Sequence, residues 1–246
     1  MTISLITTCY NSGKTVERTI QSVMSQSYNN IEYIVVDGAS TDGSVEIIKH
    51  YVEGITHFVS ESDNGIYEAI NKGIRLATGD VIGLLHSDDV FYSRDVLAKI
   101  ADVFSQSQTD IVYGNGIYVS PKHPEKIIRN WISGEYRKKK IEQGWLPLHP
   151  TVYVKRKVFD RCGLYDESYK IASDSDMLVR MLYKNSFEIY YLNEYIVRMC
   201  MGGISTSFKS QIYKWKEDIR MYRSHSFHPY WTLGKKILSK IPQFVK

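Results

Sequence analysis

The fold class of this chain is decided by one short segment, Ile31-Glu32-Tyr33-Ile34-Val35-Val36-Asp37-Gly38. Its centre is apolar at successive positions, which indicates a strand buried on both faces, as in a parallel sheet. The segment ends in a carboxylate and a glycine, a combination typical of a turn. Because ligands of open α/β sheets bind outside the carboxyl ends of the strands, Asp37 is a candidate binding residue.

The same pattern repeats through the first half of the chain. Short apolar runs bounded by turn residues predict strands at Ile3–Thr8, Ile31–Asp37, Thr56–Ser60, Val81–Leu85 and Asp110–Tyr113. Apolar residues at helical spacing between them predict helices near residues 16–23, 45–52, 66–74 and 96–103. This alternation predicts an α/β fold with a Rossmann-like, mostly parallel sheet and helices on both faces.

The second half of the chain is less regular. Its predicted elements are, in chain order, paired strands at Tyr113–Val119 and Lys126–Trp131, a charged surface or loop at Arg137–Lys140, a helix at Asp174–Lys184, and strands at Phe187–Leu192 and Tyr195–Met201. The helix is predicted because its apolar residues fall on one face.

Charge is divided unevenly along the 246 residues, whose formal net charge is +4. Residues 1–120 carry a net charge of −8 and residues 121–246 a net charge of +12. At 43% hydrophobic and 24% charged residues, the composition is that of a globular protein and excludes a disordered or fibrous chain. The basic excess of the second half suggests an anionic partner.

The basic excess is greatest at residues 207–246, for which two interpretations stand. The segment can be a solvated helical face, or an amphipathic segment that lies on an anionic membrane with Trp215 and Trp231 as anchors. Nucleic acid is the other polyanion to consider, but no known reading module is present, and we expect none as a partner.

Cysteine content and the N-terminus indicate the compartment. Cys9, Cys162 and Cys200 are too few and too scattered for a disulfide framework or a zinc cluster. The N-terminus lacks a basic region before its apolar run, so it does not resemble a signal peptide, and no run reaches the length of a membrane span. We expect a cytoplasmic protein with reduced thiols.

Acidic residues follow two of the predicted strands. Asp37 can accept a hydrogen bond from a ligand or stabilise its turn, whereas Asp42 is better explained by the turn or by a helix cap with Ser44. Asp88 and Asp89 are adjacent carboxylates at a strand end, and they repel each other unless a cation or ligand hydroxyls absorb the charge. Oxygen ligands suit Mg²⁺ or Mn²⁺ bound to substrate phosphates.

A third acidic site precedes the helix of the second half. Asp176 lies in the first turn and is the expected cap, favoured by the helix dipole. Asp174 lies earlier and can point from the helix end into a cleft, where it would serve as a general base.

A P-loop is excluded, although Ser12-Gly13-Lys14-Thr15 ends like one. The P-loop pattern requires a glycine five residues before Gly13, but position 8 is Thr8. The loop would therefore lack the backbone that holds the phosphates.

Ten motifs extend over about residues 2–205. They are Ser4–Asn11, Ser22–Tyr28, Glu32–Ser44, Asp63–Gly73, Ala77–Asp80, Ser87–Asp89, His149–Thr151, Asp166–Glu167, Ser173–Asp174 with Arg180, and Gly202–Ser205. Together they resemble the family 2 glycosyltransferases, inverting enzymes with the GT-A fold. The Asp63–Gly73 and His149–Thr151 variants are similar to the branch that builds bacterial surface polysaccharides.

The resemblance implies roles for the first half in binding a nucleotide-sugar donor. Asp37 would accept the uracil N3–H, with Thr8 and Tyr10 around the base. Asp88 would hold ribose hydroxyls. Asp89 would bind the Mn²⁺ or Mg²⁺ that bridges the two phosphates and stabilises the leaving nucleoside diphosphate.

The resemblance also implies roles in the second half. Asp174 would remove the proton from the acceptor hydroxyl, and single displacement would invert the anomeric centre. His149 would contact the acceptor or the diphosphate, although a structural loop histidine before Pro150 is an equal alternative.

The sequence departs from the family pattern near Asn71. Many members have arginine before this asparagine, but here the residue is Ile70, and Lys72 follows. Asn71 and Lys72 are therefore candidate donor-binding residues, and the cation facing the diphosphate would be Lys72, Arg75 or the metal.

We expect residues 1–206 to form the glycosyltransferase domain, with a nucleotide-sugar half (1–120) and an acceptor half (121–206). Residues 207–246 would form a basic, amphipathic, helical extension, and the protein would be cytoplasmic or peripheral on the inner membrane face. The acceptor would be a saccharide or a lipid-diphosphate-linked saccharide. The alternatives are a nucleotidyltransferase that makes the activated sugar, and a non-catalytic nucleotide-sugar binding module.

Overall fold

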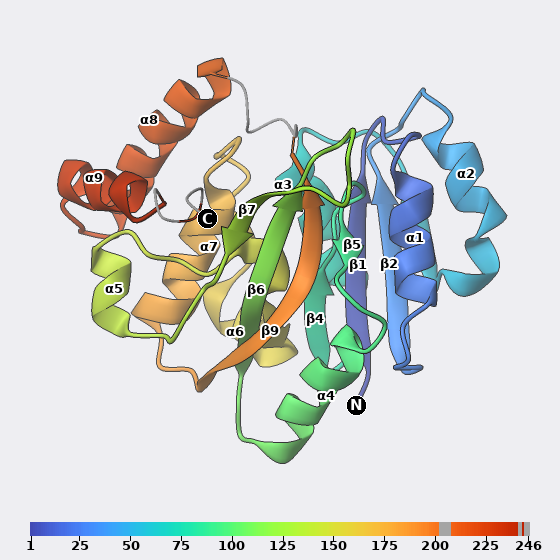
Figure 1. The fold of residues 1–246 in the computed structure, drawn as a ribbon, viewed down its shortest axis with the longest axis horizontal. Helices are drawn as coiled ribbons and strands as arrows, with labels where there is room; N and C mark the ends of the chain where they lie inside the picture. The colour runs from blue at the N-terminus through green and yellow to red at the C-terminus, as the bar shows by residue number, and fades with distance from the viewer. Residues whose placement is uncertain (202–207, 241–242, 244–246) are drawn as a thin grey trace.

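The computed structural model describes residues 1–201, 208–240 and 243. Its centre is a nine-stranded sheet of order β3-β2-β1-β4-β8-β6-β9-β5, in which β7 pairs with β6 (Figure 1). The strands are β1 (Ile3–Cys9), β2 (Ile31–Asp37), β3 (His57–Ser60), β4 (Val81–Leu84), β5 (Val90–Phe91), β6 (Ile111–Val119), β7 (Ile127–Trp131), β8 (Tyr153–Lys155) and β9 (Ile189–Cys200).

Helices connect these strands and follow them at the C-terminal end. They are α1 (Val16–Met24), α2 (Ser44–His50), α3 (Ile66–Leu76), α4 (Val96–Gln106), α5 (Lys138–Glu142), α6 (Arg156–Cys162), α7 (Ser173–Val179), α8 (Phe208–Ser224) and α9 (Pro229–Lys240). Short 3₁₀ helices lie at Val52–Gly54 and His149–Thr151.

The first four strands are parallel, as predicted. β1 pairs with β2 and β4, and β2 pairs with β3. Successive residues of β1 face opposite sides of the sheet, so Leu5 packs in one apolar cluster and Ile6 in the other. The continuous apolar pattern of Ile34-Val35-Val36 has the same cause, because helices cover both faces.

Two apolar cores lie on the two faces of the sheet. One contains the buried side chains of α1, α2 and α4, and the other contains those of α3, α6 and α7. The predicted α/β architecture with helices on both faces is therefore confirmed.

The strands of the second half are longer than predicted. The two strands predicted at Asp110–Tyr113 and Tyr113–Val119 form one strand, β6. It pairs with β7, as expected, and the two strands are antiparallel. The two strands predicted at Phe187–Leu192 and Tyr195–Met201 are also one strand, β9. The polar residues between them stay in the strand because β9 continues beside β6 through two register shifts.

Two predictions for the second half need correction. The charged segment Arg137–Lys140 lies largely on the surface, as predicted, but it enters the helix α5 and is not a loop. In this helix Ile141 is buried, and Lys140 lies over the ring of Trp145 at 5.7 Å. The helix predicted over Asp174–Lys184 is α-helical only to Val179 and continues as a π-helical turn, Arg180–Lys184.

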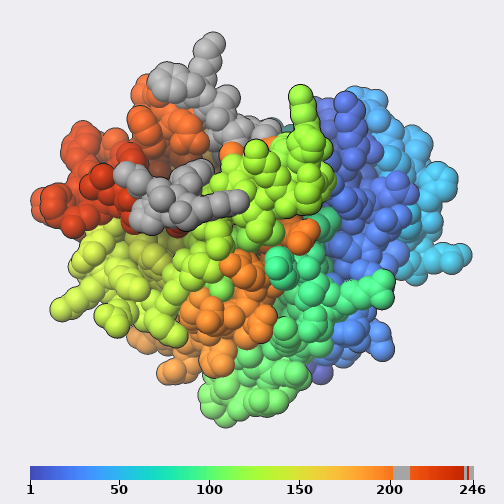
Figure 2. All heavy atoms as spheres, in the orientation of Figure 1, coloured from blue at the N-terminus to red at the C-terminus, as the bar shows by residue number. Residues whose placement is uncertain are grey.

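The helices α8 and α9 lie beside each other at the opposite end of the molecule from α2 (Figures 1 and 2). Met221, Tyr222 and Leu233 from this pair are buried in the same core as α7. The Gly202–Ser205 motif and the expected boundary at residue 206 lie outside the described residues. Among the described helices, none combines the length and hydropathy that a membrane crossing requires.

Candidate active site

Carboxyl ends of parallel strands meet at one edge of the sheet. Cys9 at the end of β1 is paired in register with Asp37 at the end of β2, and β4 on the other side of β1 leads into Asp88 and Asp89. The polar residues predicted from separate motifs therefore lie along one edge.

Asp37 is buried and strongly hydrogen-bonded within its own turn. Its carboxylate accepts from the backbone N–H and hydroxyl of Ser40 and from the hydroxyl of Ser60, the last at 2.7 Å. These contacts stabilise the turn after β2, which was one of the two roles predicted for Asp37. Each carboxylate oxygen accepts two hydrogen bonds, so Oδ1, with one donor, retains capacity for a ligand.

The backbone after Asp37 packs closely against neighbouring side chains, which is why residue 38 is a glycine. A Cβ atom at Gly38 would lie 2.6 Å from Oδ2 of Asp63 and 3.3 Å from Cδ2 of Tyr10. The ring of Tyr10 is exposed, as a ring that stacks on a ligand must be in the free protein. Burial raises the pKa of the Asp63 carboxyl.

Asp42 has a structural role, as expected. Its carboxylate accepts from the backbone N–H of Gly13 at 2.8 Å and of Ser44 at 3.1 Å, which ties the loop after β1 to the turn after β2. Helix α2 begins at Ser44 without a side-chain cap, so the capping alternative is wrong.

Asp89 is the most unusual carboxylate of the site. It is 1% exposed, and within the described part of the chain no hydrogen-bond donor reaches its Oδ2 atom. Burial raises its pKa well above the ordinary value, and the charge of neighbouring Asp88 adds to this effect. A buried carboxylate oxygen without a donor is unfavourable unless a cation binds it.

A divalent metal fits this arrangement. In the described part of the chain, no three His, Cys, Asp or Glu side chains converge as a complete ligand set. Asp89 and Asp88 could supply one or two oxygen ligands, leaving the other positions for phosphate oxygens and water, which is how Mg²⁺ and Mn²⁺ commonly bind at nucleotide sites.

Two histidines join the strand ends to the second half of the chain. Nδ1 of His86 lies 3.1 Å from the hydroxyl of Thr8, and the His86 ring stacks on His149 with ring centroids 6.4 Å apart. Nε2 of His149 lies 2.7 Å from the hydroxyl of Tyr165. Burial lowers the pKa of His149 to about 4, so this histidine is neutral at pH 7.

Asn71 is buried and holds the loop that carries Tyr165. Its Nδ2 donates to the Tyr165 carbonyl at 2.9 Å and to Glu167 at 2.7 Å, while its Oδ1 accepts from the Tyr165 N–H at 2.9 Å. The amide is thus engaged with the loop rather than directed toward an open surface.

Lys72 is engaged by carboxylates of its own neighbourhood. Its ammonium lies 3.0 Å from Glu61 and 3.1 Å from Glu68. Burial alone would lower its pKa, but these two partners raise it, so the side chain stays charged. The structure does not bring Lys72 or Asn71 together with the acid pair, and their contact with a donor stays a prediction.

Asp174 lies in the first turn of α7 and is half-buried. Its Oδ1 accepts from the backbone N–H of Ser175 at 2.7 Å, and its own N–H is 3.4 Å from the hydroxyl of Tyr67. Burial alone would raise its pKa, but the opposing charges, led by that of Lys214, hold the pKa below the ordinary value. The carboxylate is therefore ionised at neutral pH.

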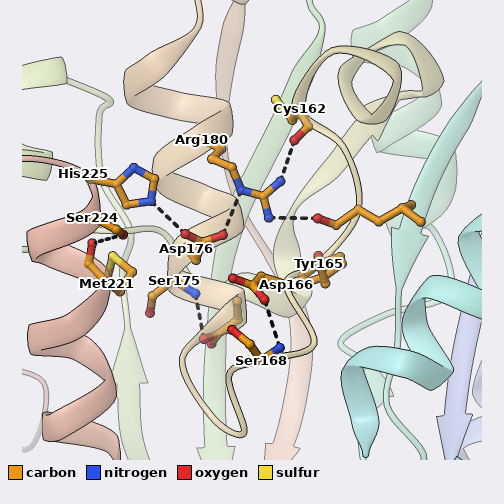
Figure 3. A network of polar contacts seen from close by, with 12 residues as sticks. Cys162, Tyr165, Asp166, Ser168, Ser175, Asp176, Arg180, Met221, Ser224 and His225 are labelled. Carbon is orange, nitrogen blue, oxygen red and sulfur yellow. Dashed lines mark hydrogen bonds and ion pairs between the residues drawn. The ribbon is translucent and has the colours of Figure 1, made fainter.

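Asp176 is not the helix cap that the sequence suggested. Figure 3 shows Arg180 and His225 directed toward it from either side, with Nε of Arg180 and Nε2 of His225 each 2.8 Å from a carboxylate oxygen. Arg180 also donates to the carbonyls of Cys162 and Leu164. Asp176 is buried, and its carboxylate pairs with Arg180 and His225 instead of accepting from the backbone N–H groups of the helix end.

Tyr118 on β6 connects the acid pair with Asp174. Burial raises the pKa of its hydroxyl to about 12, and the charges of Asp89, Asp174 and Asp88 contribute to the increase, while Arg129 opposes it. A row of contacts links the strand ends to Asp174, since His86 stacks on His149, His149 lies beside Tyr165, Tyr165 stacks on Tyr67, and the hydroxyl of Tyr67 accepts from the Asp174 N–H.

Sequence reasoning missed four residues of this site, His86, Tyr165, Tyr118 and Tyr67. His86 had a weak signal, since it directly precedes Ser87-Asp88-Asp89. Tyr67 also had a signal, because it lies within the Asp63–Gly73 motif. Tyr118 and Tyr165 had none, because their places depend on the packing of β6 and of the loop before α7.

The fold defines the class of protein. TarS 1–349 of Staphylococcus aureus in complex with UDP-GlcNAc superimposes with a TM-score of 0.72 at 19% identity, covering 90% of this chain and 65% of that chain. Mannosyltransferase PcManGT from Pyrobaculum calidifontis, in complex with GDP-Man and Mn²⁺, superimposes with a TM-score of 0.68 at 16% identity, covering 91% and 63%. The fold is therefore the GT-A fold expected above, and this chain spans about two thirds of each neighbour's length.

Sequence similarity identifies the family. Residues 4–163 match Glycosyl transferase family 2. An uncharacterized glycosyltransferase of Mycobacterium tuberculosis is 31% identical over 186 residues, covering 73% of this chain and 68% of that protein. A PGL/p-HBAD biosynthesis glycosyltransferase of Mycobacterium bovis is 25% identical over 209 residues, covering 83% and 79%. The chain belongs to glycosyl transferase family 2, which makes it a glycosyltransferase rather than a nucleotidyltransferase.

Proposed function

We propose that this enzyme is an inverting glycosyltransferase that moves a sugar from a nucleoside-diphosphate donor, of the UDP-sugar class, to a saccharide or lipid-linked saccharide acceptor. The observation that carries the proposal is the contrast between two carboxylates of the candidate site, Asp89 and Asp174. Asp89 is buried with an oxygen that lacks a donor, and Asp174 is ionised and half-buried. Asp89 is therefore suited to binding a cation, and Asp174 is suited to accepting a proton.

The reaction needs little more than these groups. The acceptor hydroxyl oxygen forms a bond to the anomeric carbon as the bond from that carbon to the donor phosphate breaks. The hydroxyl proton passes to the carboxylate of Asp174, whose Oδ1 already accepts one hydrogen bond, from the Ser175 N–H. Attack opposite the leaving group inverts the anomeric centre, and no enzyme nucleophile is required.

Donor binding is assigned to the strand ends. Asp37 would accept from the base, Tyr10 would stack on it, Thr8 would lie beside it, and Asp88 would bind the ribose. Asp89 would hold Mn²⁺ or Mg²⁺, which supplies Lewis-acid stabilisation of the leaving diphosphate when bound. Support comes from their common edge of the sheet and from PcManGT, a neighbour of this fold that was solved with GDP-Man and Mn²⁺.

The remaining predicted residues act around this centre. His149 is neutral and hydrogen-bonded to Tyr165, so it would contact the acceptor or diphosphate as a polar, uncharged group. Asn71 would position Tyr165 through the loop. Lys72 would contribute to the diphosphate only if it left Glu61 and Glu68.

The acceptor side is assigned to residues 121–206 and the helical extension to residues 207–246. The Mycobacterium bovis relative, a PGL/p-HBAD biosynthesis glycosyltransferase, supports a biosynthetic transfer to an acceptor of the proposed saccharide class. Helix α9 exposes three large apolar side chains, Tyr230, Trp231 and Leu238, which are 67%, 65% and 63% exposed. Exposed apolar surface of this kind is typical of a protein or membrane contact. We therefore place the enzyme on the inner face of the cell membrane, with this surface of α9 at the lipid interface.

A nucleotide-sugar screen tests the proposal. UDP-, GDP- and dTDP-sugars are added with MnCl₂ or with EDTA, while the unfolding temperature and donor hydrolysis are measured. We expect one nucleotide class to raise the Tm by about 5 °C at saturation, only with metal. NMR of the released sugar or product should show an anomeric configuration opposite to the donor's, and retention or metal-independent turnover would refute the mechanism.

A further inference from the structure

A cavity lies between α8, α9 and β7, outside the strand-end site. Its volume is about 360 Å³, a size typical of small-molecule sites. Four cations line it, namely Arg129 from β7, Lys214 from α8, and Lys236 and Lys240 from α9. Among the lining side chains that the structure describes, Asp218 is the one acidic residue.

The cavity carries an excess of positive charge. Nζ of Lys236 lies 2.9 Å from both carboxylate oxygens of Asp218, so this carboxylate is already engaged. In the described ranges 1–201, 208–240 and 243, no carboxylate lies within ion-pair distance of Lys214 or Lys240. Arg129 donates to Oε1 of Gln243 at 2.8 Å.

This crowding is unfavourable in the free protein. Burial, and then the charges of Lys236, Lys214 and Arg129, lower the pKa of Lys240 to about 7. Trp131 forms part of the surroundings, since Lys240 and Arg129 lie 5.6 and 4.3 Å from its ring. Cations held together in a cavity without enough counter-charge are a ready site for a polyanion.

The cavity is close to the acceptor side of the active site. The charges of Lys214 and Lys236 lower the pKa of Asp174, the proposed base. Arg129 lies over the ring of Tyr118, 5.3 Å from its centroid, and Tyr118 responds to the charges of Asp89 and Asp174. The cavity therefore adjoins Tyr118 through its lining residue Arg129.

We propose that this cavity is a phosphate-binding site that holds a phosphate or diphosphate group of the acceptor. The site itself stands on the cavity and its cations, whereas its assignment to the acceptor rests on the proposed function. Lys214 and Lys240 are its main ligands, because they have no carboxylate partner in the described part of the chain, and Lys236 is held in place by Asp218.

Calorimetric titration with inorganic pyrophosphate in EDTA tests the site without a donor or metal. We compare the wild-type chain with Lys240→Met, Lys214→Gln and the control Lys216→Gln, an exposed lysine of α8. We expect binding by the wild type and the control, and at least a tenfold loss of affinity in each cavity variant. No wild-type binding at 10 mM pyrophosphate (about the weak limit of such sites), or equal binding by all four proteins, would overturn the proposal.

Folding does not obscure this test. Removing a crowded cation should leave the Tm of Lys240→Met unchanged or higher, and Lys214→Gln provides a second variant if the first fails to fold. Pyrophosphate bound at the strand-end site instead would be insensitive to both substitutions. If wild-type pyrophosphate binding depends on Lys240 but the donor screen shows no turnover, the proposed function fails and the phosphate site stands.

Two competition experiments identify the source of the phosphate. Neutral vesicles containing a polyprenyl diphosphate are compared with vesicles containing the matching polyprenol, and glucose 1-phosphate is used as a soluble sugar phosphate. Displacement of pyrophosphate by the polyprenyl diphosphate alone indicates a lipid-borne group, and displacement by glucose 1-phosphate indicates a soluble one. Displacement by neither contradicts the assignment to the acceptor.

Discussion

Two aspartates of the active site are shifted in opposite directions by their surroundings. Burial raises the pKa of Asp89, whose Oδ2 lacks a donor within the described residues, while the charge of Lys214 helps to lower that of Asp174. Such divergence separates the roles of chemically identical side chains. It favours Asp89 as the residue that takes a cation and Asp174 as the residue that stays ionised to take a proton.

Substitution of these aspartates should separate binding from chemistry. Asp174→Asn keeps the shape but cannot accept the proton, so we expect kcat to fall by about 10²–10⁴ with donor affinity within about twofold. Asp89→Ala should abolish metal-dependent donor binding. Single-turnover kinetics and donor titration measure both, with exposed Asp160→Asn as the unaffected control. Loss of donor binding in Asp174→Asn would refute its role as the base.

Lys240 should limit stability in a pH-dependent way. Its pKa is lowered to about 7 in the folded chain, by burial and by Lys236, Lys214 and Arg129, with Asp218 opposing. The unfolded chain, with a lysine pKa near 10.4, holds this proton more tightly. The destabilisation is therefore complete below pH 7 and disappears as the pH rises toward 10.

We therefore expect Lys240→Met to raise the Tm by several degrees at pH 6 and by less at pH 9. Thermal unfolding in phosphate-free buffer measures this, because phosphate would fill the cavity. Lys216→Met is the control and should show no such pH dependence. A larger gain at pH 9 than at pH 6 would contradict the assignment of the lowered pKa.

At the scale of elements, α3 and the loop before α7 are joined through one buried side chain. Asn71 makes three hydrogen bonds to Tyr165 and Glu167, and Tyr165 holds His149. Asn71, which the sequence suggested as a donor-binding residue, therefore positions the loop that carries Tyr165.

Asn71→Ala should act mainly on stability. Unsatisfied backbone groups at Tyr165 would cost about 2 kcal/mol, or about 6 °C in Tm, while donor affinity stays within about twofold. Thermal unfolding and donor titration measure the two effects. A tenfold loss of donor affinity at unchanged Tm would instead show direct contact with the donor.

The success of prediction also differed between elements. The strands and helices of the first half were predictable because each buries a regular apolar pattern against the sheet. β9 was predicted as two strands because Asn193 and Glu194 interrupt its apolar run, yet Asn193 accepts hydrogen bonds from Asn115 and Tyr191 across and along the sheet. Helix α5 was missed because its one buried residue, Ile141, packs against residues that are far away in the sequence.

At the scale of the whole molecule, the exposed surface of α9 and the basic cavity beneath it lie on the same helical pair. Trp231 is exposed with Lys235 over its ring at 4.9 Å, an arrangement suited to a lipid interface. Because Thr232 and Leu233 are buried, substitution is a cleaner test than truncation of this segment.

The double variant Trp231→Ser with Leu238→Ser should lower binding to anionic vesicles by about tenfold or more at 0.1 M salt. Vesicle sedimentation measures the binding, and Tyr190→Ser on β9, also exposed, is the matched control. Equal binding by wild type and double variant would exclude this surface as the membrane contact.

The sequence by itself determined the α/β class, the strand ends and the candidates Asp37, Asp88, Asp89 and Asp174, because local apolar pattern and turn chemistry act over a few residues. Only the tertiary structure decided which strand ends lie at one edge, that Asn71 hydrogen-bonds to the Tyr165 loop and Asp176 to Arg180, and that Arg129 meets Lys214 and Lys240 in one cavity. Burial and the distances between charges depend on packing between segments far apart in the chain, and these quantities set the pKa values and the excess charge of the cavity.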